Sequence, residues 1–190
     1  MASLVDRMAL AKTTELSEAT LAVEAAATRL CWGMSEEQLS WQPRPRSWSI
    51  AENLAHLRAT TEVFLPAVDA ALTAIRKAGL ESKGSCELGL YGRLLVWSME
   101  CRPIIKMRAP KLIQPRLLDS PASELRHFLN SQAAMRQRIT DADGLDLTAF
   151  RFPSPLVRCL RVNLLEFFST LNAHSRRHLR QADKVRRKML

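Results

Sequence analysis

The sequence predicts an all-α protein, a four-helix bundle with long crossing loops and an extra short helix. Apolar residues make up 47% of the 190 positions, and they recur every three to four residues along most of the chain. We find no segment whose pattern favours a strand, and no internal repeat of the kind that predicts a solenoid. The length and apolar content suit a single domain over residues 1–190.

The first long helix is predicted from an apolar stripe that stops near Gly33. Its core positions are Leu16, Val23, Ala27 and Leu30. A turn-rich stretch follows, and we interpret Trp41 and Trp48 within it as packing residues that cover an end of the core. Ser49 and Glu52 then form a capping box, which predicts the start of the second long helix.

We expect the second helix to bend at Pro66 and to end at Gly79. A shorter helix is predicted from Leu88 to Cys101, where Pro103 stops it. Residues 103–120 predict a basic, extended connection that crosses the surface. Its apolar members are expected to pack down onto the bundle; they are Ile104, Ile105, Leu112 and Ile113.

The third long helix is predicted to start with Ser120 as its N-cap and Pro121 in its first turn, and to end at Asp141. A proline-containing loop leads to the last helix, from about Asn163 to the C-terminus. Four long helices joined in part by long crossings favour an antiparallel bundle over a solenoid.

The charge balance is strongly basic, with 28 lysines and arginines against 19 acidic residues and a net charge of +9. Much of the excess lies on the last helix, where cations complement the helix dipole, so we do not expect a nucleic-acid partner from charge alone. Acidic residues interrupt the first thirty positions, which excludes a signal-peptide pattern and a membrane span there, and we expect a cytoplasmic protein. The four cysteines form no CxxC pair and are expected to be reduced, partly buried thiols.

Three histidines carry the functional signal. His174 and His178 are one turn apart in the apolar stripe of the last helix, so both imidazoles face the core, and His56 lies near the start of the second helix. If these two helices are neighbours, the three side chains form a ligand set for a divalent metal. Ordinary hydrogen bonding to carbonyls or side chains is the alternative way to satisfy buried imidazoles.

Two segments resemble signatures of the DinB-like superfamily, four-helix metal-binding proteins that include the bacillithiol and mycothiol S-transferases. The first is MSEEQLSWQPRPRSWSIAENLAHL, from Met34 to Leu57, and the second is LLEFFSTLNAHSRRHLRQ, from Leu164 to Gln181. The resemblance implies a DinB/YfiT-like bundle in which the three histidines hold one divalent cation, usually zinc or nickel, with water on its open side.

A metal with open positions can hold a low-molecular-weight thiol as thiolate and deliver it to an electrophile, as the thiol-transferase branch implies, or it can activate water for hydrolysis. Glu52 and Gln181 are candidates to orient the ligands, although a capping box already explains Glu52 and a polar helix flank already explains Gln181. We place His127 at the surface or rim. Arg177 could meet an anionic cosubstrate, but we expect it to face solvent.

A non-catalytic reading is also open. In it the bundle is a binding or regulatory module, the metal is structural or absent, and the basic last helix meets an acidic partner. The native metal, the thiol, the electrophile and the choice between monomer and homodimer do not follow from the sequence.

Overall fold

The computed structural model describes residues 4–82, 86–101, 109–157 and 159–189, with side chains from residue 12 onward. The long helices are α1 (Leu4–Cys31), α3 (Ile50–Lys77), α5 (Glu124–Asp141) and α6 (Leu164–Arg186). The short elements are α2 (Glu36–Ser40), α4 (Leu90–Glu100), the 3-10 helix η1 (Lys111–Ile113), β1 (Phe152–Pro153) and β2 (Arg161–Val162). The predicted all-α class and the extra short helix are confirmed.

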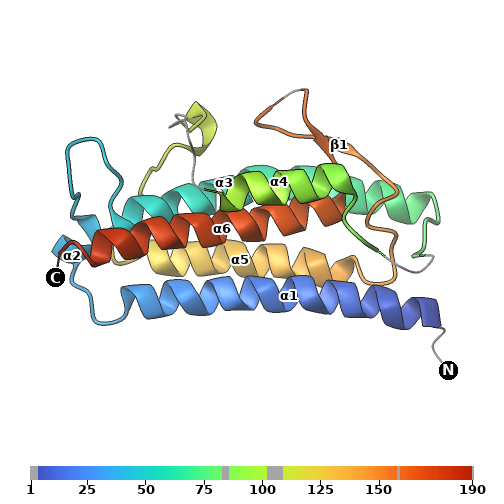
Figure 1. Ribbon diagram of the computed structural model, residues 1–190, viewed down its shortest axis with the longest axis horizontal. Helices are drawn as coiled ribbons and strands as arrows, with labels where there is room; N and C mark the ends of the chain where they lie inside the picture. The colour runs from blue at the N-terminus through green and yellow to red at the C-terminus, as the bar shows by residue number, and fades with distance from the viewer. Residues whose placement is uncertain (1–3, 83–85, 102–108, 158, 190) are drawn as a thin grey trace.

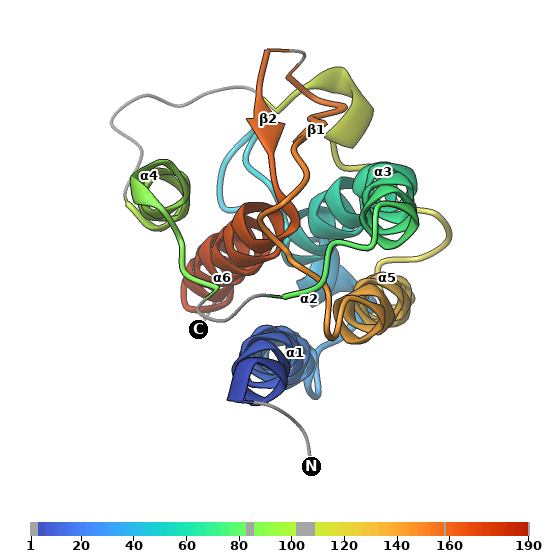
Figure 2. The ribbon, with the colours of Figure 1, turned by 90° about the vertical axis from the view of Figure 1, so that its right-hand side faces the viewer.

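The four long helices form a bundle, and α4 packs on its outside against α6 (Figures 1 and 2). Viewed along the bundle, α1 and α3 occupy opposite corners, and α5 and α6 each lie between them (Figure 2). Helices α1 and α6 run in one direction and α3 and α5 in the other (Figure 1). The bundle is therefore not antiparallel throughout, because the long crossing from α3 to α5 lets these neighbours run parallel.

Capping residues set the starts of the helices that matter most for the site. Ser49 and Glu52 form the predicted capping box of α3. Asn163 and Glu166 form another at the start of α6. Helix α3 continues through Pro66 to Lys77, so this proline does not end it.

Two details of the sequence prediction are wrong. Helix α5 begins at Glu124 rather than near Ser120, because Ser120 and Ser123 bond to each other in a turn that precedes the helix. A short antiparallel pair, β1 and β2, also forms in the loop before α6, where no strand was expected. Phe152 and Val162 on these strands are buried, so the hairpin closes one end of the core.

The connection between α4 and α5 is only partly described. Residues 102–108, which include Pro103, Ile104 and Ile105, lie outside the described residues. Beyond them Ile113 is buried as expected, whereas Leu112 is exposed.

The core consists of two apolar clusters separated by polar side chains. One cluster includes Phe64, Met135 and Phe168, and the other includes Leu54, Phe128 and Leu179. Between them each long helix contributes buried polar residues, which include Thr20, Thr60, Thr61, Ser131, Gln132, Asn172 and Ser175. The polar layer lies at the level of the predicted histidines, and buried polar groups at this density require specific partners.

None of the described helices is long and apolar enough to cross a membrane. The four cysteines are free thiols, as expected; Cys31 is buried, Cys86 and Cys101 are half-buried, and Cys159 is exposed.

Candidate metal centre

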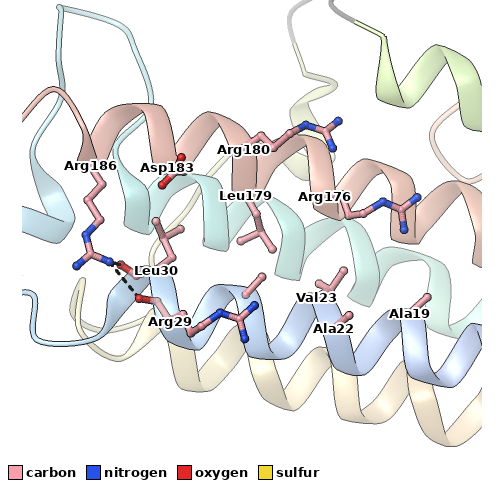
Figure 3. Close-up of a pocket in the computed structure, with 11 residues that line it drawn as sticks. Ala19, Ala22, Val23, Arg29, Leu30, Arg176, Leu179, Arg180, Asp183 and Arg186 are labelled. Atoms are coloured by element: carbon pink, nitrogen blue, oxygen red, sulfur yellow. Dashed lines mark hydrogen bonds between the residues drawn. The ribbon is translucent and has the colours of Figure 1, made fainter.

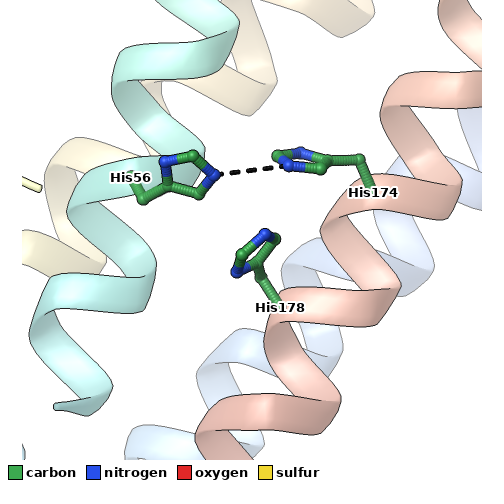
Figure 4. Close-up of side chains that lie close together, drawn as sticks. All are labelled: His56, His174 and His178. Atoms are coloured by element: carbon green, nitrogen blue, oxygen red, sulfur yellow. Dashed lines mark hydrogen bonds between the residues drawn. The ribbon is translucent and has the colours of Figure 1, made fainter. Parts of the chain in front are cut away.

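The three predicted histidines converge between α3 and α6 (Figure 4). His56 projects from the second turn of α3 toward His174 and His178, which follow one another on the facing side of α6. One ring nitrogen from each residue lies within 4.8 Å of the other two. Only 2% of His56 and 8% of His178 are exposed, and His174 is half-buried. The structure therefore brings together residues that are up to 122 positions apart in the sequence, as a ligand set made of these three histidines requires.

The ring orientation of His56 is set by a backbone carbonyl. Its Nδ1 lies 2.6 Å from the carbonyl oxygen of Ile113, the last residue of η1. Because a carbonyl only accepts hydrogen bonds, Nδ1 carries the proton and Nε2 presents a lone pair. The connection from α4 to α5 thus selects the tautomer that a metal ligand needs.

The orientation of His178 is set by Asn53. Nδ2 of Asn53 donates to the carbonyl of Ser49 at 2.8 Å, so Oδ1 is free to accept from Nδ1 of His178 at 3.2 Å. This arrangement leaves a lone pair on Nε2 of His178. Two of the three imidazoles are consequently fixed in the same tautomer by acceptors on their outer sides.

His174 differs from the other two. Its Nε2 lies 3.3 Å from Nε2 of His56, whereas its buried Nδ1 has no hydrogen-bond partner within the described part of the chain. Since His56 offers only a lone pair at this position, the contact is either a long hydrogen bond donated by His174 or the separation of two ligands of one cation.

The cluster is uncharged at neutral pH. Burial lowers the pKa of His178 to about 2 and that of His174 to about 3, and neighbouring histidines and Arg177 add to both effects. Burial also lowers the pKa of His56, partly offset by its bond to Ile113. Only neutral imidazole binds a metal, so these shifts keep the cluster in its ligating form.

The donor set fits a divalent cation. Two nitrogen ligands of a tetrahedral zinc ion lie about 3.4 Å apart when each is about 2.0–2.1 Å from the metal. The 3.3 Å between Nε2 of His56 and Nε2 of His174 is close to this value. Three imidazoles leave at least one coordination position for another ligand, which distinguishes a catalytic site from a closed structural one.

The two predicted orienting residues have other surroundings. Oε2 of Glu52 accepts from the backbone of Ser49 at 2.7 Å and from Gln42 at 2.8 Å. Gln181 is half-buried, and the described residues include no hydrogen bond between it and a histidine of the cluster. Ile113 and Asn53 instead make the outer contacts that the structure shows.

Trp48 was interpreted as a packing residue, and its surroundings show a closer relation to the cluster. The centroid of its ring lies 4.7 Å from that of His56 and 5.6 Å from that of His178, with the second pair stacked. The indole therefore covers one side of the histidines. Its position one residue before the Ser49 cap is the signal that could have placed it there.

A buried ion pair holds the connection that carries Ile113. Nε of Arg58 lies 3.3 Å from Oε2 of Glu124, and Nη2 donates to the carbonyl of Arg116 at 2.7 Å. The other carboxylate oxygen of Glu124 accepts from the backbone of Leu118 at 2.8 Å. Arg58 therefore holds the connection at Arg116, and Glu124 holds it at Leu118. Both points lie a few residues after Ile113, whose carbonyl orients His56.

The fourth histidine and a groove lined partly by charged residues lie apart from the cluster. Nε2 of His127 lies 2.8 Å from Asp119 and takes no part in the site. A groove of about 560 Å³ runs between α1 and α6, with Val23 and Leu179 among its apolar residues and Arg29 and Arg180 among its charged ones (Figure 3). The groove includes none of the three histidines, so the candidate chemistry does not lie in this groove.

The expectation that Arg177 faces solvent holds only in part. The side chain is half-buried, and its Nε is buried without a hydrogen-bond partner among the described residues. Its charge also acts on His174 and His178. Arg177 therefore belongs to the surroundings of the cluster.

A helical bundle with three converging, neutral imidazoles from two neighbouring helices defines a class of protein with a candidate site for a divalent metal. Comparison with protein families is consistent with this class. Residues 19–182 match the model of the DinB superfamily, and the chain belongs to that superfamily. Searches of curated proteins and of solved structures found no match.

Proposed function

We propose that the protein binds one divalent cation, zinc or nickel, through His56, His174 and His178, and that it transfers a low-molecular-weight thiol to an electrophile. The observation that carries the proposal is the pair of acceptors behind the cluster. Ile113 and Asn53 fix the protons of His56 and His178 on Nδ1, and both Nε2 lone pairs remain for a cation.

When bound, a cation with an open position stabilises a thiol as its thiolate near neutral pH. In the transfer the sulfur forms a bond to the electrophilic carbon as the bond to the leaving group breaks, and the leaving group takes that electron pair. The thiol proton passes to solvent. The protein's own residues keep three ligands neutral, hold two rings in place and cover one side of them with Trp48.

We favour thiol transfer over hydrolysis because metal-dependent hydrolases commonly use a carboxylate as general base for the attacking water. In the described chain the candidate ligand cluster consists of histidines alone, without a carboxylate. Glu52, the acidic residue nearest to His56 on α3, is engaged by Ser49 and Gln42. A thiol loses its proton to solvent more readily than water does, so thiol transfer depends less on a base in the site.

Elemental mass spectrometry of protein purified without a histidine tag tests the metal. We expect about one equivalent in the wild type and none after His56, His174 and His178 are all changed to Ala. His127→Ala is the matched control, because this histidine bonds to Asp119 outside the cluster, and it should retain the metal. Equal and negligible metal in all three proteins after incubation with zinc or nickel would contradict the proposal and favour a metal-free binding module.

The reaction is tested on the metal-loaded wild type with a panel of small thiols and a chromogenic aryl halide. Thioether formation that disappears in the triple variant and persists in His127→Ala supports thiol transfer. Ester hydrolysis with the same dependence on the three histidines, without thioether formation, would instead identify a hydrolase.

A further inference from the structure

Arg177 differs from the other arginines of α6. Arg176 pairs with Glu100, and Arg180 donates to the backbone carbonyl of the same residue. Arg186 donates to the carbonyls at the end of α1, and Arg187, the residue that follows α6, pairs with Asp183. In the described part of the chain Arg177 has no comparable ion pair or hydrogen bond, although its Nε is buried.

Two more buried polar atoms on the same stripe of α6 share this property. Oγ1 of Thr170 and Nδ1 of His174 are buried and have no hydrogen-bond partner among the described residues. Positions 170, 174 and 177 are spaced by four and three residues, so their side chains lie along one face of the helix. Buried polar atoms are nearly always bonded in native proteins, and three on one stripe beside a candidate metal site indicate a place for a polar ligand.

The chemistry of the three atoms defines the ligand. The guanidinium of Arg177 can only donate hydrogen bonds, and the hydroxyl of Thr170 can donate one. Nδ1 of His174 is also a donor when Nε2 holds a cation. Three donors, one of them a permanent cation with no acidic partner among the described residues, match an anionic acceptor. The planar guanidinium suits a carboxylate.

We propose that Arg177, with Thr170 and His174, forms an anion-binding subsite beside the histidine cluster, and that the thiol cosubstrate carries a carboxylate. The assignment of the anion to a thiol rests on the proposed function, because the histidine cluster is where the sulfur would bind. The subsite itself rests on the contacts of Arg177 and its neighbours on α6. With this subsite the protein selects its cosubstrate by charge.

The test compares two thiols of nearly equal size that differ in charge, 3-mercaptopropionate and 3-mercaptopropionamide. Isothermal titration of the zinc-loaded wild type is expected to show the carboxylate binding at least about tenfold more tightly, in line with a charge-assisted hydrogen bond of about 1.5–3 kcal/mol. In Arg177→Gln the two affinities should agree within about twofold, with zinc content and the affinity for the amide unchanged.

Arg180→Gln is the matched control, because it removes the same charge from a position on α6 that lines the groove toward α1. This variant should keep the preference for the carboxylate. Arg177→Lys retains the charge without the planar guanidinium and should keep part of the preference, which covers the case in which Arg177→Gln does not fold. Equal affinities in the wild type, or a preference that survives in Arg177→Gln, would overturn the subsite.

A second measurement separates the subsite from the proposed function. Thermal unfolding of the metal-free protein is followed with propionate or propionamide, so that neither metal nor thiol is involved. Stabilisation by propionate alone, lost in Arg177→Gln, supports the anion subsite even if the zinc-loaded protein binds no thiol. Binding of both thiols with equal affinity, without stabilisation by propionate, would leave the proposed function intact and overturn the subsite.

Discussion

Oδ1 of Asn53 lies 3.2 Å from Nδ1 of His178, and the two residues are on different helices, α3 and α6. The amide of Asn53 is itself oriented by its bond to the carbonyl of Ser49, the N-cap of α3. The start of α3 therefore determines which ring nitrogen of His178 presents its lone pair to the cluster. A capping motif and a candidate metal ligand are linked by a single side chain.

Asn53→Ala is expected to weaken metal binding about 10- to 100-fold, because His178 loses the acceptor that fixes its tautomer and ring orientation. Competition with a chelator of known affinity measures the change. Asn172→Ala is the matched control, since Asn172 is also buried but bonds to Thr20 and the carbonyl of Leu16 on α1. Both variants should lose stability, whereas an equal loss of metal affinity in both would show that Asn53 has no special relation to the site.

Trp48 should report metal binding through its fluorescence. Its ring lies against His56 and His178, so an open-shell ion such as Ni²⁺ at the cluster should quench its emission, whereas closed-shell Zn²⁺ should quench it far less. Trp48→Phe should lose the Ni²⁺-dependent quenching. Trp32→Phe removes an indole that is 79% exposed, and this variant should keep the Ni²⁺-dependent quenching. Quenching that is unchanged in Trp48→Phe would place the bound nickel elsewhere.

The sequence predicted the elements that depend on side-chain periodicity and caps. The four long helices and the Ser49 capping box follow from residue spacing within a single segment, and so does the placement of His174 and His178 on one face of α6. His56 lies beside His174 and His178 because α3 and α6 are neighbours. Periodicity alone does not specify which helices are neighbours. The resemblance to a known family supplied that information.

The missed features depend on contacts between distant segments. The acceptor for His56 is a backbone carbonyl at Ile113, and a carbonyl leaves no trace in a pattern of side chains. Asn53 did carry a signal, because it is a buried polar residue between apolar positions of α3, where buried amides require partners. The burial of Nε of Arg177 depends on elements packed beside α6, and helical spacing alone does not reveal it.

The Arg58–Glu124 pair should contribute to both stability and the site. Glu124 is fully buried and Arg58 nearly so. Glu124→Ala removes the buried partner of Arg58, which keeps its bonds to Glu62 and to the carbonyl of Arg116, and it leaves the backbone N–H of Leu118 without its acceptor. We expect a loss of about 3–5 kcal/mol in the free energy of unfolding, measured with urea on the metal-free protein. Metal affinity should also fall, because the connection that carries Ile113 is loosened.

Two variants bracket this effect. Glu124→Gln keeps an acceptor of the same shape and should cost less than Glu124→Ala. Asp69→Ala removes an exposed ion pair with Arg138, which has two bonds of 2.7 and 2.8 Å, and should cost less than about 1 kcal/mol with no change in metal affinity. If Asp69→Ala destabilised the protein as much as Glu124→Ala, burial would not be the property that makes the Arg58–Glu124 pair important.

The metal-free protein should lose stability as the pH falls from about 6.5 toward 3. The folded pKa values of His174 and His178 are about 3 and about 2, and histidine in an unfolded chain titrates near 6.5. In this interval the unfolded chain binds protons that the folded chain does not, so the free energy of unfolding decreases with decreasing pH. Each histidine contributes a slope of up to about 1.4 kcal/mol per pH unit.

Urea unfolding in the presence of a chelator, at intervals from pH 7.5 to 4, measures this slope in the wild type and in His178→Gln. The carboxylates titrate in both proteins, so the difference between the two curves isolates the contribution of His178 and of its effect on His174. The wild type should lose stability more steeply than the variant on acidification. Parallel curves would mean that His178 accepts a proton in the folded protein, and an imidazolium there would be incompatible with a cluster preset to bind a cation.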